Sequence, residues 1–117
     1  MNEAEELLGI HLTELGLPFE RQYPYAKGRR LRADFALLDS WLLIEITGGV
    51  YHGGAHGSVE GVLRDIDRLN AATLNLWRVL RFIPDQVKDG TAIATISRTL
   101  GAFALEEQAR GAREPTT

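Results

Sequence analysis

One short segment, WLLIEIT at positions 41–47, constrains the fold of this chain more than any other. Its apolar run lies between the turn residues Asp39-Ser40 and a glycine-rich stretch, which is typical of a strand. Even the longer, mainly apolar stretch 35–46 is far short of the ~20 residues that a membrane-spanning helix needs. The segment therefore predicts a β-strand that is apolar on both faces except at Glu45 and Thr47.

Periodic patterns in the rest of the chain predict the other elements. Apolar residues three and four positions apart indicate helices, and alternation indicates strands. The predicted order is helix, three strands, helix, strand, helix, with helices over 3–15, about 59–73 and about 93–104, and strands over 19–25, 30–38, 41–47 and 77–83. Because the last strand follows a helix, it is expected to be parallel to its neighbour. The apolar stripe of the middle helix is formed by Val59, Val62, Leu63, Ile66, Leu69 and Thr73.

Length and composition limit the class of protein. With 117 residues, 44% of them apolar, the chain is expected to form one domain over 1–110, followed by a disordered tail over 111–117. The absence of cysteine excludes disulfides, thiolate metal sites and cysteine nucleophiles. The first ten residues carry three glutamates and no lysine or arginine, the reverse of a secretory signal. A cytoplasmic protein without a membrane partner is expected.

Basic residues are concentrated in one segment. The chain has 13 basic and 16 acidic residues and a net charge of −3. Residues 21–32 nevertheless contain no acid and five cations, namely Arg21, Lys27, Arg29, Arg30 and Arg32. The excess of arginine over lysine suits bidentate phosphate contacts, and biased codon usage would produce it equally well.

Glu45 is the most unusual residue, because a carboxylate inside an apolar run needs a cation or a metal to offset its desolvation. Asp34 lies on the polar face of the preceding predicted strand, and a hairpin would place the two acids side by side. Two adjacent carboxylates suit a divalent cation such as Mg²⁺. The alternative is ordinary salt bridges to one or more of Arg30, Arg32, Arg78 and Arg81.

Five short segments follow one another in a fixed order: Ala33-Asp34-Phe35, Glu45-x-Thr47-Gly48-Gly49, the Gly-Gly-x-His run from Gly53 to His56, Asp65-x-x-Arg68-x-Asn70, and Trp77-x-Val79-Leu80-Arg81-Phe82. Together with the order of elements, they resemble the PD-(D/E)XK nuclease superfamily over about residues 4–90. The resemblance is strongest to small single-domain phage and bacterial members related to very-short-patch-repair endonucleases. It implies a restriction-endonuclease-like three-layer α/β core, α-β-β-β-α-β-α, with a mixed central sheet, in a bacterial or phage-infected cell.

The resemblance also implies an activity, the metal-dependent hydrolysis of DNA phosphodiester bonds. Asp34, Glu45 and the main-chain carbonyl of Ile46 would hold Mg²⁺, with Mn²⁺ as a substitute, and the metal would activate a water. Relatives often add a glutamate from the first helix, for which Glu5 has the better orientation. Glu5 is equally well explained as a first-turn acid that favours the helix dipole. No organic cofactor is expected.

Further roles follow from the same resemblance. Thr47 stands where most of the superfamily has lysine, and Arg68 is expected to supply the missing cation. His56 would act as acid or base and His52 would contact a phosphate, although a histidine in a loop is often a plain surface residue. Asp65 and Arg68 would otherwise form an exposed helical ion pair. The phosphate-binding residues are expected to be Arg21, Lys27, Arg29, Arg30, Arg32 and His52.

Three modes of action remain open. The enzyme would nick DNA at a structure or short motif, resolve four-way junctions, or have become an inactive nucleic-acid-binding module. A symmetric double-strand cut would require a homodimer. Trp41 and Trp77 are expected to be core aromatics rather than platforms for base stacking.

Overall fold

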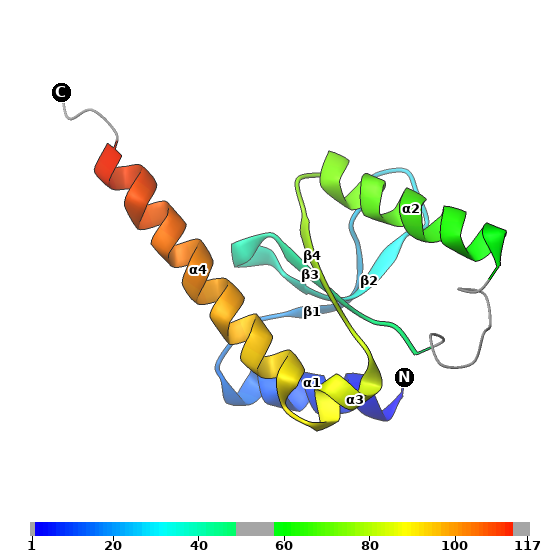
Figure 1. Ribbon diagram of the computed structural model, residues 1–117, viewed down its shortest axis with the longest axis horizontal. Helices are drawn as coiled ribbons and strands as arrows, with labels where there is room; N and C mark the ends of the chain where they lie inside the picture. Colours follow the sequence, from blue (N-terminus) through cyan, green and yellow to red (C-terminus); the bar gives the residue numbers. More distant parts are fainter. Residues whose placement is uncertain (1, 49–57, 114–117) are drawn as a thin grey trace.

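The computed structural model describes residues 2–48 and 58–113, and nine elements follow one another in it (Figure 1). They are α1 (Glu3–Glu14), β1 (Glu20–Pro24), β2 (Arg32–Leu37), the 3-10 turn η1 (Leu38–Ser40), β3 (Leu42–Ile46), α2 (Val59–Leu74), β4 (Arg78–Phe82), α3 (Pro84–Lys88) and α4 (Thr91–Arg113). The sheet has the order β1-β2-β3-β4. Strand β2 is antiparallel to both β1 and β3, and β4 is parallel to β3. The predicted α/β class, the mixed sheet and the parallel crossover are confirmed.

Helices cover both faces of the sheet and produce three layers (Figure 1). One core lies between the sheet and α1, α3 and α4, and its fully buried side chains include Leu8, Phe35 and Ile96. The second core lies between the sheet and α2, and most of its buried residues are alanines, such as Ala36 and Ala72. Burying each large apolar side chain contributes about 1.5–3 kcal/mol, so the first core holds the fold together most strongly.

The end of the chain differs from the sequence prediction. The predicted last helix, about 93–104, lies within α4, whereas the short helix α3, which begins at Pro84 and is separated from α4 by Gly90 with φ of +86°, was not predicted. Helix α4 then continues through Arg113, past the expected domain boundary at residue 110. Residues 114–117 lie outside the described residues. In the part of the chain that is described, no helix is both long and apolar enough to cross a membrane.

Helix α2 does not bury its large apolar residues. An apolar stripe of this kind ordinarily faces the core. Here Ala71 and Ala72 are buried against the sheet, whereas the larger members of the stripe are exposed, namely Val59, Val62, Leu63, Ile66 and Leu69. The sheet-facing surface of α2 is therefore made of small residues.

The regular alternation of β1 and β2 is interrupted where Gln22 lies opposite Asp34. Gln22 has φ of +48°, a left-handed conformation that is uncommon in a strand. Ala33 packs in the core beneath α2 and Phe35 in the core beneath α1, although residues two apart on a regular strand share a face. This change of face leaves the Asp34 side chain directed along the sheet, toward β3.

Candidate active site

A shallow depression of about 250 Å³ lies where β3 ends, and its mainly polar lining comes from five parts of the fold. Strands β2 and β3 contribute Asp34, Glu45 and Ile46, the segment after β3 adds Thr47 and Gly48, helix α2 adds Asp65 and Arg68, and β4 adds Arg81. Five of the residues predicted from the sequence are thus brought together: Asp34, Glu45, Ile46, Thr47 and Arg68.

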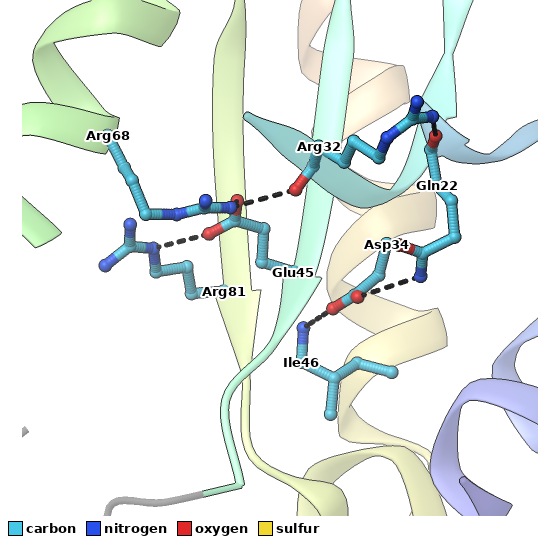
Figure 2. Close-up of polar contacts among 7 residues, drawn as sticks. All are labelled: Gln22, Arg32, Asp34, Glu45, Ile46, Arg68 and Arg81. Carbon is cyan, nitrogen blue, oxygen red and sulfur yellow. Dashed lines mark hydrogen bonds and ion pairs between the residues drawn. The ribbon is translucent and has the colours of Figure 1, made fainter. Parts of the chain in front are cut away.

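Asp34 is held by hydrogen bonds to both of its oxygens (Figure 2). The backbone N–H of Ile46 donates to Oδ2 at 2.8 Å, and Nε2 of Gln22 donates to Oδ1 at 3.4 Å. The Ile46 bond links the carboxylate to β3 just beyond the last paired residues of β2 and β3, Phe35 and Ile44. Asp34 therefore replaces a main-chain partner at the point where the hairpin opens.

Glu45 faces a different set of partners, two arginines. Nη2 of Arg68 donates a hydrogen bond to Oε1 at 2.7 Å. Nε of Arg81 lies 3.2 Å from Oε2 and forms an ion pair with it, but the geometry is not that of a hydrogen bond. The Glu45 side chain is only 12% exposed, so these cations offset the cost of its desolvation. Figure 2 shows the carboxylates of Glu45 and Asp34 turned toward separate partners. The Arg81 pair is one of the salt bridges that the sequence left open as an alternative.

Arg68 connects α2 to the sheet. Besides Glu45, its Nη2 donates to the carbonyl of Arg32 at 2.9 Å, and its guanidinium lies 5.8 Å from the ring centre of Tyr25. Burial opposes its charge, but the hydrogen bond and charge of Glu45 outweigh burial and raise the pKa of Arg68. A permanent cation therefore lines the depression that Thr47 also lines.

Glu5 reaches the same region from the first turn of α1. Asn2 caps this helix by accepting a hydrogen bond from the N–H of Glu5 at 2.9 Å. Burial, the negative charge of Asp34 and a hydrogen bond to the Asp34 carboxyl group all raise the pKa of Glu5. The neighbouring Glu6 is exposed and lies 3.8 Å from Arg21 instead. Of the two glutamates, Glu5 is the one beside Asp34.

The donor atoms fit a hard divalent cation in part. Glu5 and Asp34 form a pair of adjacent carboxylates, and Mg²⁺ typically takes one or two carboxylates together with waters. Within residues 2–48 and 58–113, no three or more histidine, aspartate and glutamate side chains are gathered as a ready metal cluster. Glu45 would have to exchange an arginine for the metal in order to complete such a set.

The cations predicted to bind phosphate differ in their contacts. Arg29 forms an ion pair with Asp67 of α2, which lowers the pKa of Asp67, and Nη1 of Arg32 donates to the carbonyl of Gln22 at 3.0 Å. Lys27 and Arg30 are exposed between β1 and β2. Arg21 lies apart, with its guanidinium 5.2 Å from the ring centre of Phe35. His52 and His56 lie outside the described residues.

Sequence reasoning did not assign a role to Gln22 or Asp65. Asp65 lines the depression from α2, and the sequence had indicated it only as half of an exposed ion pair. Gln22 touches Asp34 through a left-handed backbone conformation, and no sequence signal marks it, because such a conformation ordinarily favours glycine or asparagine.

This arrangement of helices and mixed sheet defines the chain as an α/β protein with the fold of an endonuclease catalytic domain. The solved structure that shows this likeness is the homing endonuclease I-Bth0305I catalytic domain, with a TM-score of 0.64 and 20% sequence identity over 84% of this chain and 93% of that one. The restriction-endonuclease-like fold class is thereby confirmed. No family model matches the chain, and no curated protein matches it.

Proposed function

We propose that this chain is a metal-dependent endonuclease that hydrolyses phosphodiester bonds of DNA. The observation that carries the proposal is the placement of Asp34: its carboxylate is fixed by the N–H of Ile46 in a depression shared with Glu45 and two arginines. The likeness of the fold to an endonuclease catalytic domain gives this depression a chemical context. The finer relation to very-short-patch-repair endonucleases is part of the same proposal.

The acidic residues are proposed to hold Mg²⁺ or Mn²⁺. Asp34 and Glu5 supply adjacent carboxylates, the carbonyl of Ile46 a third oxygen, and Glu45 a fourth once Arg68 or Arg81 has moved to a phosphate. A bound divalent metal supplies a polarised phosphate and an activated water. A metal would also relieve the repulsion between Glu5 and Asp34, which favours its binding.

The basic residues are proposed to position the DNA. Arg68 lines the same depression as Thr47 and would compensate for the absence of a lysine there, while Arg81 balances Glu45 from β4. Lys27, Arg29, Arg30 and Arg32 would contact the phosphate backbone, with Arg21 contributing least because it packs against α1. His56 is proposed as acid or base and His52 as a phosphate contact.

One observation favours a second candidate, a DNA-binding module without hydrolytic activity. Glu45 is already neutralised by two arginines, so the site is electrostatically satisfied as it stands. The same depression would then bind DNA through Arg68 and Arg81 and require no metal. Nicking, junction resolution and a homodimeric double-strand cut are subdivisions of the first candidate.

Plasmid cleavage separates the two candidates. Supercoiled plasmid, a four-way junction and a mismatched duplex are incubated with Mn²⁺ and either wild type, Asp34→Asn, Glu45→Gln or the control Asp85→Asn, an exposed acid on α3. We expect wild type and Asp85→Asn to cut at least one substrate, and Asp34→Asn and Glu45→Gln to lose about 100-fold or more in rate. EDTA should abolish cutting. Equal rates for all four proteins, or binding without cutting of any substrate, would contradict an enzymatic role.

A further inference from the structure

A second cavity lies at the opposite ends of β3 and β4 from the candidate active site. It has a volume of about 450 Å³ and is lined by residues that include Trp41, Leu76, Arg78, Phe103, Glu107 and Arg110. Trp41 and Arg78 stand at the amino ends of the two parallel strands, whereas the candidate active site lies near their carboxyl ends. In Figure 1, α4 runs past this end of the sheet. Nothing in the proposed hydrolysis uses this cavity.

Two residues in strained conformations form its rim. Among the described residues, positive φ outside glycine occurs at Gln22, Trp41 and Leu76, and the last two both line this cavity, with φ of +51° and +69°. Their side chains are 52% and 76% exposed. Bulky residues rarely adopt this conformation, and such strain is found preferentially at functional positions. The backbone here holds apolar side chains in solvent.

Trp41 differs from its sequence prediction. It was expected to be a core aromatic, but only its partner Trp77 is mostly covered, between Tyr23 and Trp41, with ring centres 5.5 and 4.9 Å away. Trp77 supports one side of the Trp41 ring, and about half of the Trp41 surface remains open. Trp41 therefore has the position of a stacking platform.

The lining favours a neutral planar group. Across the cavity the guanidinium of Arg78 lies over Phe103, 3.7 Å from its ring centre. Two cations, Arg78 and Arg110, are balanced by two acids, Asp39 and Glu107, so the cavity has no excess of positive charge to attract a phosphate. Aromatic walls with polar groups at the edge suit a nucleobase, which stacks on its faces and makes hydrogen bonds at its edges.

We propose that this cavity binds one unpaired nucleobase of the DNA substrate, stacked on Trp41. The proposal rests on the proposed function and specifies its substrate, DNA that carries a bulged or otherwise unpaired base. The five residues of β3 separate the two sites by about 17 Å at about 3.3 Å per residue. At about 3.4 Å per nucleotide, cleavage is expected about five nucleotides from the unpaired base.

The test compares a labelled duplex that contains one extra unpaired base with the fully paired duplex, by fluorescence anisotropy in EDTA. Wild type should bind the bulged duplex about tenfold more tightly, a preference that Trp41→Ala abolishes and Trp41→Phe retains. Affinity for the paired duplex should not change. The control Leu105→Ala removes an exposed apolar side chain of α4 outside the cavity and should retain the preference.

A second variant protects the test against misfolding. Leu76→Gly removes an apolar rim residue and relieves its positive φ, so it should fold at least as well as wild type and still lose most of the preference. Equal binding of both duplexes by wild type, or an unchanged preference in Trp41→Ala and Leu76→Gly, overturns the nucleobase site. Plasmid cleavage that depends on Asp34 would then leave the proposed function intact. Failure of wild type to bind any DNA overturns both.

Discussion

At the scale of single residues, the position of Asp34 depends on two neighbours that carry no charge. The N–H of Ile46 and the amide of Gln22 hold its two oxygens, and the left-handed Gln22 turns the strand pair so that this side chain points along the sheet. A carboxylate directed in this way reaches Glu5 of α1 rather than Glu45 of the adjacent strand. The acidic pair with mutual repulsion is therefore Glu5 and Asp34.

This pair predicts a pH-dependent stability. The folded-state pKa of Glu5 lies above its ordinary value of 4.5, because of burial and the charge of Asp34. At a pH between 4.5 and the folded-state pKa, the folded chain keeps a proton on Glu5 that the unfolded chain releases. The contribution of Glu5 to stability is therefore fully present below pH 4.5 and is lost as the pH rises through the folded-state pKa. As the pH rises through this range, the melting temperature of wild type should fall relative to that of Glu5→Gln.

The control for this experiment is Glu6→Gln, the adjacent and exposed glutamate. Its pH profile should follow that of wild type. At a pH above the folded-state pKa of Glu5, addition of Mn²⁺ should raise the melting temperature of wild type more than that of Glu5→Gln, because a ligand of the folded state stabilises it. If the melting temperatures of wild type and Glu5→Gln depend on pH in the same way, the charge of Asp34 does not affect the titration of Glu5.

At the scale of elements, α2 is informative because its buried face is small and its large residues face outward. Ala72→Leu should destabilise the protein by about 1–3 kcal/mol, since the added methylenes have no space against the sheet. Leu63→Ser on the exposed stripe should change the free energy of unfolding by no more than about 0.5 kcal/mol. Urea denaturation measures both. A larger loss for Leu63→Ser than for Ala72→Leu would mean that the stripe is packed in solution.

The same helix shows what a sequence can predict about elements. Periodicity located every strand and the parallel crossover, because period and turn residues are local properties of the chain. It did not predict which side of α2 packs, since that depends on how closely the helix approaches the sheet. It also did not predict α3, a helix of five residues that begins at Pro84 and is separated from α4 by Gly90.

The candidate site could also be predicted from the sequence only in part. Asp34 and Glu45 were predicted to lie together, and both line one depression. The partners of Glu45 could not be assigned, because Arg68 comes from a helix 23 positions later and Arg81 from a strand that pairs only in the finished sheet. The exposure of Trp41 was also beyond sequence reasoning, since an aromatic in an apolar run ordinarily indicates a core.

At the scale of the whole molecule, charge distribution decides how DNA would be held. The net charge is −3, so affinity must come from local clusters rather than from overall attraction. Arg30→Glu should weaken binding of any duplex and reduce the slope of log affinity against log salt by about 0.9 for each lost phosphate contact. Arg98→Glu makes the same change of charge at an exposed position of α4 and should have little effect. If a salt titration shows equal losses of DNA affinity for Arg30→Glu and Arg98→Glu, the DNA does not bind at Arg30.

The parallel pairing of β3 with β4 also determines when during folding the candidate site comes into existence. Strands β1, β2 and β3 are joined by short connections and pair locally, whereas β4 must return across the whole α2 crossover. Loop-closure entropy grows with the length of such a connection, so docking of β4 is the costly late step. Glu45 and Arg81 face each other across that pairing, and their contact forms only when β4 docks. A nascent or partly folded chain would therefore carry an incomplete candidate site, and the proposed nuclease activity would begin only once the last strand is in place.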